Sequence, residues 1–249
     1  MTRIPADYQP APDLLRERTI LVTGAGQGLG RAVAVACAAH GATVALLGRK
    51  QEKLEKTYDA IVDAGHPEPA LVPLDLASAG EHEFDQLANL LKKDLKGLSG
   101  IAHCASHFVP LRPLADHSWE QWNLLLRVNL TAPFALTRAC LPLLAKKPQA
   151  AVVFTGETHG VQPAAFWGGF AVAKAGLSAL AAVWGDELEG PGKPRLNVLV
   201  PGPIASPQRA QSHPGEDHSR LPPVESAARG FLYLLGPDSA PTTGQTVSL

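Results

Sequence analysis

The chain has few cysteines and no excess of charge of either sign. Its 249 residues include three cysteines, and 22 basic residues balance 23 acidic ones to leave a net charge of −1. Such a balanced, well-mixed charge gives no electrostatic footprint for nucleic acid or for an anionic membrane. We therefore expect a small molecule as the substrate or effector, with no nucleic acid and no membrane among the partners.

The cysteines and the first residues of the chain also lack the marks of an exported protein. Cys37, Cys104 and Cys140 are odd in number and form no C-x-x-C pair, as is typical of reduced thiols. Asp7 and three nearby prolines interrupt the apolar core that a signal peptide needs. The apolar runs are too short for a membrane span, and Lys174 interrupts the run that comes nearest to one. These features predict a cytoplasmic protein.

Strand patterns alternate with helical patterns along the chain. We expect strands at 19–23, 43–47, 70–74, 100–104, 151–155, 196–200 and 246–249. We expect helices at 28–40, 51–64, 81–95, 118–144, 168–189 and 224–235. This alternation predicts an α/β fold, a doubly wound parallel sheet of about seven strands with helices on both faces. Residues 1–249 are interpreted as a single domain, with 1–13 as an N-terminal extension.

Glycines cluster directly after the first long strand. Thr23, Gly24, Gly28 and Gly30 form the pattern Thr-Gly-x-x-x-Gly-x-Gly, and an apolar helical pattern follows. At such a turn, backbone N–H groups and a helix N-terminus can face a pyrophosphate. The pattern indicates a dinucleotide cradle, and the alternative is a tight turn that binds nothing.

The glycine spacing resembles that of the short-chain dehydrogenase/reductase family, and the resemblance covers roughly residues 14 to 248. Its other motifs follow in the family's order: 41–49 as the second strand, Leu74-Asp75-Leu76, Val128-Asn129, Lys174 and 197–204. Residues 13–15, 47–49 and Asn129 also resemble a bacterial subgroup of oxidoreductases. The resemblance implies a Rossmann fold whose cofactor-binding residues are Thr23, Gly24, Gly28, Leu29, Gly30, Arg49, Asp75, Leu76, Lys174, Pro201, Gly202 and Ile204.

The end of the second strand bears on the choice of cofactor. Folds that prefer NAD place an acidic residue there for the ribose 2′-hydroxyl, whereas this chain has Gly48 followed by Arg49 and Lys50. Two cations attract a 2′-phosphate, so we expect NADP, with NAD less favoured. In the alternative interpretation, both cations simply begin a solvated helix.

The resemblance breaks down at the residues expected to carry catalysis. The family's Tyr-x-x-x-Lys motif holds a phenol beside an ammonium on one helix face, which eases proton loss from the phenol. Here the motif runs from Phe170 to Lys174, and none of the three tyrosines has a lysine four residues downstream. The family's serine, thirteen residues before the tyrosine, is replaced by Glu157. The catalytic-site residues of interest are therefore Asn129, Glu157, Phe170 and Lys174.

Two functions remain open. The first is a homologue that binds NADP(H) with lost or much reduced catalysis and acts as a sensor, regulator or oligomer subunit. The second is an active oxidoreductase with a substitute acid, for which Glu157 is the first candidate because an apolar pocket can raise a carboxyl pKa. His159, His103 and His107 are the next candidates. Glu157 could instead form an ion pair with Lys174 and seal the site.

Three further expectations concern a metal, a lid and self-association. His103, Cys104 and His107 lack a fourth ligand at useful spacing, so no metal is expected. The polar, proline-rich segment 206–223 is expected to be a mobile loop, and the resemblance implies that it is the lid over the substrate. The helices at 118–144 and 168–189 are apolar on several faces. They favour a homodimer or homotetramer, although an intramolecular fit with tightly packed alanines is the alternative.

Overall fold

The computed structural model describes residues 1–190 and 192–249, and its centre is one sheet of eight strands. Their order is β1-β8-β7-β6-β5-β2-β3-β4, and all neighbouring strands are parallel. The strands are β1 (Thr2–Arg3), β2 (Thr19–Thr23), β3 (Thr43–Gly48), β4 (Ala70–Pro73), β5 (Gly100–His103), β6 (Ala151–Thr155), β7 (Arg195–Val200) and β8 (Thr246–Ser248). The expected doubly wound α/β fold is confirmed.

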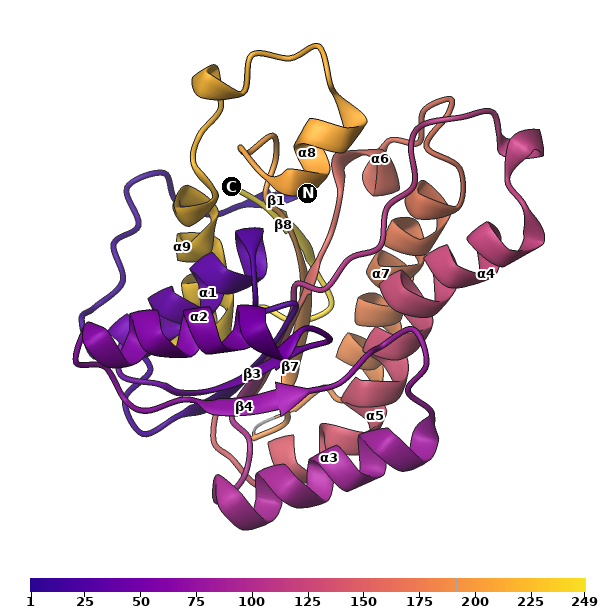
Figure 1. Cartoon of the computed structure of the whole chain (residues 1–249). Coiled ribbons are helices and arrows are strands. Elements are labelled where there is room, and N and C mark those ends of the chain that lie inside the picture. Colours follow the sequence, from indigo (N-terminus) through magenta and orange to yellow (C-terminus); the bar gives the residue numbers. More distant parts are fainter. Residues whose placement is uncertain (191) are drawn as a thin grey trace.

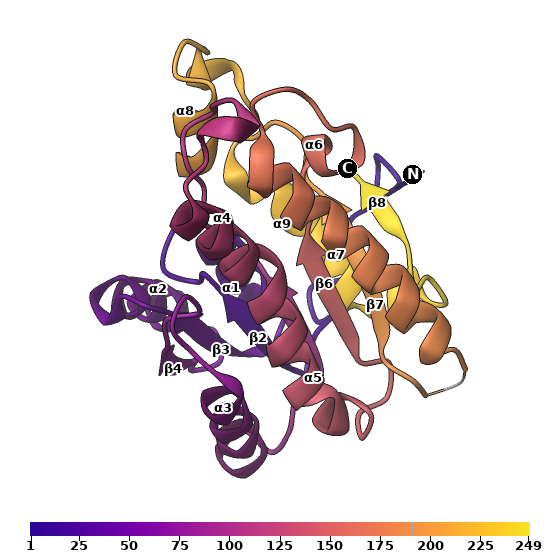
Figure 2. The same ribbon diagram turned by 90° about the vertical axis from the view of Figure 1, so that its right-hand side faces the viewer.

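Helices cover both faces of the sheet (Figures 1 and 2). One face carries α1 (Gly28–Ala39), α2 (Gln51–Asp63) and α9 (Val224–Leu235), which share one apolar core with the sheet. The other face carries α3 (Glu81–Asp94), α4 (Trp119–Leu126), α5 (Ala132–Leu144) and α7 (Gly168–Glu187). Because the central strands are buried on both faces, most of their residues are apolar and the apolar positions do not alternate.

The strand order reverses between β2 and β5. From β2 the chain builds outward through β3 and β4, and from β5 it builds the other way through β6, β7 and β8. In open parallel sheets, ligands bind outside the carboxyl ends of the strands at such a switch point. The topology therefore places a candidate site above the ends of β2 and β5.

The expected helix at 118–144 is in fact interrupted. A five-residue π-helix, Arg127–Thr131, separates α4 from α5, and Asn129 lies inside it. A π-turn adds one residue to the helical ladder and commonly marks a functional site. The helix expected at 168–189 also ends earlier, at Glu187.

The N-terminal extension turns out to be part of the sheet. Thr2 and Arg3 pair with Val247 and Ser248 of β8, and Ile4 is buried in the core. The phenol of Tyr8 then donates a hydrogen bond of 2.8 Å to Asp238. The extension thereby supplies the eighth strand.

The segment 206–223, expected as a loop, contains the short helix α8 (Pro207–Ser212) and a 3₁₀ turn, His218–Arg220. Ser206 caps α8 by accepting a hydrogen bond of 3.1 Å from the backbone N–H of Arg209. Proline at the first helical position fits this start, because its fixed φ already matches the helix.

Two stretches, Trp119–Leu144 and α7, are long and apolar enough to cross a membrane by length and composition alone. Both pack on the sheet, with 44% and 50% of their most apolar windows buried, so they match core helices equally well.

Candidate functional site

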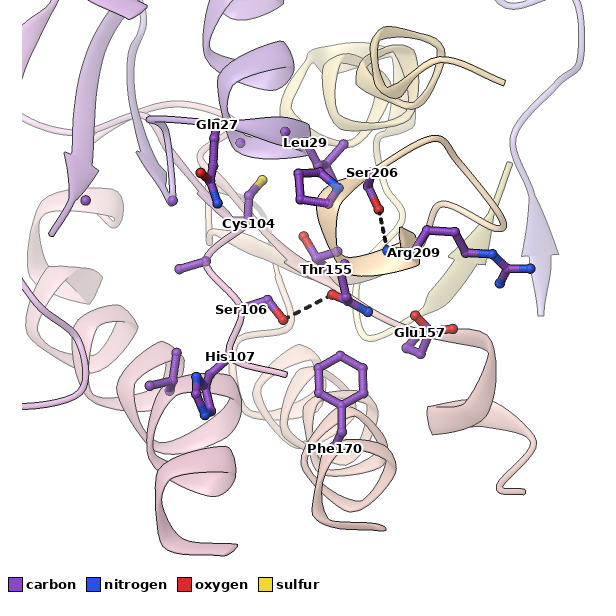
Figure 3. A pocket seen from close by; sticks show the side chains of 18 of the residues that line it. Gln27, Leu29, Cys104, Ser106, His107, Thr155, Glu157, Phe170, Ser206 and Arg209 are labelled. Atoms are coloured by element: carbon purple, nitrogen blue, oxygen red, sulfur yellow. Dashed lines mark hydrogen bonds between the residues drawn. The ribbon is translucent and has the colours of Figure 1, made fainter. Parts of the chain in front are cut away.

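A cavity of about 630 Å³ lies at the carboxyl ends of the strands (Figure 3). Its walls come from the β2–α1 turn, the ends of β3 and β4, the loop after β5, the start of α7 and the segment 201–213. Ligand pockets commonly have volumes of roughly 300–1,000 Å³, so the size suits a dinucleotide or a comparable ligand.

The β2–α1 turn requires its glycines for close packing. A Cβ on Gly30 would lie 2.2 Å from the carbonyl oxygen of Gly24, and one on Gly24 would lie 2.8 Å from Ala105 Cα. Gly24 and Gly28 also have φ values of +69° and +52°, which other residues rarely adopt. These glycines and Leu29 line the cavity, with the N-terminus of α1 facing it.

Thr23 does not line the cavity and instead holds two turns together. Its hydroxyl oxygen accepts a hydrogen bond of 3.0 Å from the backbone N–H of Ala105. This bond links the glycine turn to the loop after β5.

The end of β3 brings cations to the cavity. Arg49, Lys50 and Lys53 line it, and the Lys53 ammonium donates a hydrogen bond to the side-chain oxygen of Gln27. Asp75 and Leu76, in the turn after β4, also line the cavity, and the Asp75 carboxylate accepts a hydrogen bond of 3.0 Å from Ala77 N–H. This end of the cavity is suited to an anionic ligand group.

The segment after β7 forms another wall. Pro201, Gly202 and Ile204 line the cavity. Farther along, Pro207 approaches the glycine turn, because its Cδ lies 3.2 Å from where a Gly28 Cβ would be. Gln208 accepts a hydrogen bond of 3.3 Å from the Ser106 hydroxyl. The segment therefore closes over the glycine turn.

Lys174 is buried at the base of the cavity, with only 4% of its surface exposed. Its ammonium donates a hydrogen bond of 2.8 Å to the carbonyl oxygen of Thr155 and lies 5.4 Å from the Phe170 ring centroid. Burial lowers the pKa of Lys174 to about 8, because desolvation disfavours the charged form, while Glu157 and Cys104 act in the opposite direction.

Phe170 presents a hydrocarbon ring to the cavity. The ring is 1% exposed and stands edge-to-face against Phe108, with centroids 5.2 Å apart. Trp167 packs beside it at 6.2 Å. No polar atom of Phe170 is available for proton transfer.

Glu157 lines the cavity, but the ion pair considered with Lys174 does not form. Its Oε1 accepts a hydrogen bond of 2.9 Å from Thr158 N–H and lies 3.6 Å from His159 Nδ1. The Lys174 ammonium donates to the carbonyl oxygen of Thr155, two residues before Glu157, instead. The carboxylate thus stays directed into the cavity (Figure 3).

Asn129 lies behind the cavity wall and holds that wall in place through hydrogen bonds. Its amide donates hydrogen bonds of 2.8 and 2.9 Å to the carbonyls of His107 and Leu125, and its oxygen accepts bonds from Ser106 Oγ and His107 N–H, each of 3.1 Å. This network fixes the loop after β5.

One histidine considered as a substitute acid is in the wrong place. His103 points into the core between the sheet and α5, where it stacks on Phe154 and its Nε2 lies 2.9 Å from the Thr137 hydroxyl. Burial lowers the pKa of His103 to about 3, with a smaller effect from Lys174. The expectation was wrong because the His103 side chain is buried beneath the cavity and does not line it. His107 and His159 do line the cavity.

Cys104 lines the cavity as a thiol, because burial raises its pKa to about 12. No group of three histidine, cysteine or acidic side chains that could hold a metal ion occurs within residues 1–190 and 192–249.

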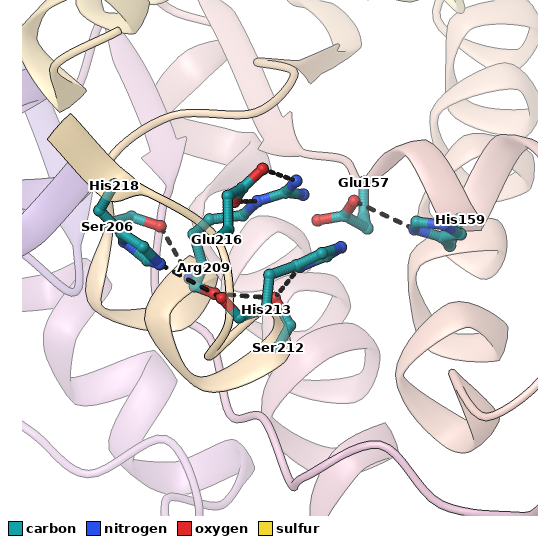
Figure 4. Close-up of polar contacts among 8 residues, drawn as sticks. All are labelled: Glu157, His159, Ser206, Arg209, Ser212, His213, Glu216 and His218. Atoms are coloured by element: carbon teal, nitrogen blue, oxygen red, sulfur yellow. Dashed lines mark hydrogen bonds and ion pairs between the residues drawn. The ribbon is translucent and has the colours of Figure 1, made fainter. Parts of the chain in front are cut away.

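Sequence reasoning missed Trp167 and several polar residues of segment 206–223, all of which line the cavity. Arg209, Ser212 and His213 line it, and the Arg209 guanidinium binds Glu216 through two hydrogen bonds of 2.6 and 2.7 Å (Figure 4). The pair Ser206-Pro207 is typical of a helix start, but nothing in the sequence indicates which side of this helix faces the cavity.

Comparisons with known proteins agree with this geometry. Residues 18–217 match the family described as short chain dehydrogenase. The oxidoreductase YciK of Escherichia coli is 36% identical over 96% of this chain and 94% of its own. A short chain dehydrogenase structure from Pseudomonas syringae is 39% identical with a TM-score of 0.94, covering 97% of this chain and 98% of its own.

Two similar structures contain a cofactor. A short chain dehydrogenase from Shigella flexneri in complex with NADP is 34% identical, with a TM-score of 0.92 over 96% of this chain and 99% of its own. One from Escherichia coli in complex with NADPH is 35% identical, with the same TM-score and coverage.

Proposed function

Because the chain belongs to the short chain dehydrogenase family, we propose that it binds NADP(H) and that its ordinary carbonyl and alcohol chemistry is lost or much reduced. One observation carries the proposal: the cavity keeps its glycine turn and its cations, whereas Phe170 offers only hydrocarbon beside Lys174. The site thus combines a cofactor cradle with a degenerate catalytic centre.

The residues present fit a dinucleotide. The glycine turn would be filled by a Cβ at Gly24 or Gly30, and Arg49 and Lys50 lie where a 2′-phosphate would be recognised. The NADP and NADPH complexes of the two similar structures favour NADP over NAD. The bound nicotinamide would supply a hydride. Lys174, Pro201 and Ile204 would help to hold the nicotinamide in place.

Reduction of a neutral carbonyl also needs a proton for its oxygen. A placed acid is typically worth about a hundredfold to ten-thousandfold in rate, and Phe170 supplies none. The ammonium of Lys174 is held by the Thr155 carbonyl, 2.8 Å away. We therefore expect slow turnover of simple ketones and aldehydes.

The alternative is an active NADP-dependent oxidoreductase that uses Glu157 as a substitute acid on a small carbonyl or alcohol. One observation favours it: Glu157 lines the same cavity as Phe170 and Lys174, with 21% of its side chain exposed. A panel of carbonyls and alcohols tests this function. Wild-type turnover of about 1 per second or faster would support it, and Glu157→Gln should then abolish the activity.

Cofactor preference is tested by calorimetric titration with NADPH and NADH. Arg49→Ala should weaken NADPH binding selectively, by about 1–3 kcal/mol for a charge-assisted phosphate contact. Lys56→Ala is a matched control, because this lysine is exposed on α2 and does not line the cavity. Equal affinities of the wild type for both cofactors would contradict the proposal.

We also propose a cytoplasmic homodimer or homotetramer that takes a small molecule as substrate or effector. Large apolar side chains remain exposed on α4, α5 and α7, among them Trp119, Phe134, Val172 and Val183. Such residues on one side of a molecule favour burial against a second subunit.

A further inference from the structure

One end of the cavity combines a carboxylate with aromatic rings. Glu157, Trp167 and Phe170 all line it, and Figure 3 shows Glu157 and Phe170 on the same side, away from the glycine turn and Gln27. Trp167 is 6% exposed and stacks on His159, with ring centroids 3.9 Å apart. The rings are therefore held in fixed positions beside the carboxylate.

The Glu157 carboxylate has no lysine or arginine partner among the described residues. The cation that could reach it from the lid is Arg209, and Glu216 already binds this guanidinium through both its Nε and its second terminal nitrogen (Figure 4). The other nearby cation, Lys174, donates to the Thr155 carbonyl. Both neighbouring cations are thus held by other acceptors.

The remaining contacts of Glu157 leave room for a ligand. Its Oε1 accepts one backbone hydrogen bond from Thr158 and faces His159 at 3.6 Å, while its Oε2 accepts none from the described residues. A carboxylate in a partly closed site gains most from a positively charged ligand, and aromatic faces attract the same charge through their quadrupoles.

We propose that this end of the cavity binds an organic cation, and that the substrate reduced there is an iminium ion or a similar cationic C=N compound. The second half of this inference rests on the proposed binding of NADP(H). Glu157 balances the ligand charge, and Trp167 and Phe170 contact its apolar part.

This substrate class removes the need for the missing phenol. Reduction of an iminium carbon takes one hydride from NADPH and forms one C–H bond, while the C=N π pair becomes the nitrogen lone pair of a neutral amine. NADPH becomes NADP⁺, and no proton is transferred. A carbonyl oxygen would need a proton at this step, which Phe170 cannot provide. The neutral amine then binds Glu157 less strongly and can leave.

Binding is tested first, without cofactor or turnover. The probe is phenyltrimethylammonium, which cannot be reduced, and its neutral carbon isostere tert-butylbenzene and the anion benzoate serve as comparisons in calorimetry. We expect the cation to bind about fivefold or more tightly than the neutral isostere, the range of a partly desolvated cation–aromatic contact. Equal binding of cation and isostere, or preferred binding of benzoate, would overturn the proposal.

Two variants make the binding test specific. Glu157→Gln should remove the preference for the cation while leaving binding of the neutral isostere unchanged. Glu216→Gln should weaken cation binding as well, because it releases Arg209 to compete for Glu157. Glu225→Gln is the matched control, since this residue lies in the first turn of α9 and does not line the cavity. Circular dichroism of each variant excludes loss of fold as the cause.

Turnover is tested with the N-methyl dihydroisoquinolinium ion against a tetralone of the same ring skeleton, following NADPH oxidation and the amine product. We expect turnover of the iminium ion at least about tenfold faster than of the ketone, the low end of what a missing acid costs. Faster turnover of the ketone would overturn the proposal. If NADPH itself does not bind in a separate titration, the proposed function fails, whereas cation binding alone stands or falls by the first experiment.

Discussion

At the scale of single residues, the substitution that bears most directly on catalysis is Phe170→Tyr. The phenol would be added within reach of the Lys174 ammonium, which lies 5.4 Å from the present ring centroid. We expect little reductase activity from this change alone, because the charge of Glu157 in the same cavity opposes the loss of the phenol proton. Phe170→Tyr combined with Glu157→Ser should be clearly more active on a diketone or quinone, with NADPH oxidation followed at neutral pH.

A hydroxyl on a neighbouring ring provides the control for this pair. Phe108→Tyr adds the same group to a ring that packs edge-to-face against Phe170 but does not line the cavity. It should leave activity unchanged. Equal activity of the single and double variants would show that Glu157 does not oppose proton loss from the phenol.

A second prediction at this scale concerns acid stability. The pKa of His103 falls from 6.5 to about 3 on folding, chiefly because of burial. Below pH 6.5 this histidine is protonated in the unfolded chain but stays neutral in the folded chain until about pH 3. The free energy of unfolding therefore decreases as the pH falls through this window. This single group contributes a slope of up to about 1.4 kcal/mol per pH unit.

Denaturant unfolding between pH 4 and 6 measures the slope. His103→Gln should flatten the pH dependence relative to the wild type, whereas His82→Gln, at an exposed position on α3, should not. An unchanged slope in His103→Gln would mean that other groups cause the acid destabilisation.

At the scale of elements, the β2–α1 turn depends on a glycine that no other residue can replace. Gly30→Ala would bring its Cβ within 2.2 Å of the Gly24 carbonyl oxygen, so the turn must shift. We expect a loss of about 1–3 kcal/mol of stability, as for other overpacked sites, together with weaker NADPH binding. Thermal unfolding and NADPH titration measure both effects. Gly215→Ala, where a Cβ meets nothing within 4 Å, should change neither.

Most elements could be predicted from periodicity, and the exceptions have physical reasons. The strands and the long helices begin and end within about two residues of expectation, because buried parallel strands form short apolar runs between helical patterns. The π-helix around Asn129 interrupts an apolar pattern that has no glycine within it. Strand β1 is too short to show any alternation, since its pairing comes entirely from β8.

The candidate site was predictable where the backbone determines it. Gly24, Gly28 and Gly30 line the cavity because only glycine allows this turn. Thr23 and Asn129 support the wall from behind, which sequence spacing cannot distinguish from contact with a ligand. The contacts of segment 206–223 could not be predicted, because pairing across a folded loop leaves no periodic signal.

At the scale of the whole molecule, we expect at least a dimer in dilute solution. Trp119 and Val183 have 73% and 55% of their surfaces exposed on α4 and α7, and burying them against a second copy would remove apolar area from water. Light scattering at micromolar concentration should give at least twice the mass of one chain. Val183→Glu should weaken the assembly, whereas Glu55→Gln, exposed on α2, should not. A monomeric mass for the wild type would contradict this prediction.

The two edges of the sheet have a consequence for aggregation. An unpaired strand is a template for a strand of another molecule, and proteins limit this hazard with short edge strands, charges and prolines. Here one edge is the two-residue β1, which covers β8 and ends in the exposed Arg3, and the other is the four-residue β4, which ends in Pro73. Neither edge offers a long backbone ladder, so uncontrolled growth of the sheet between molecules is disfavoured.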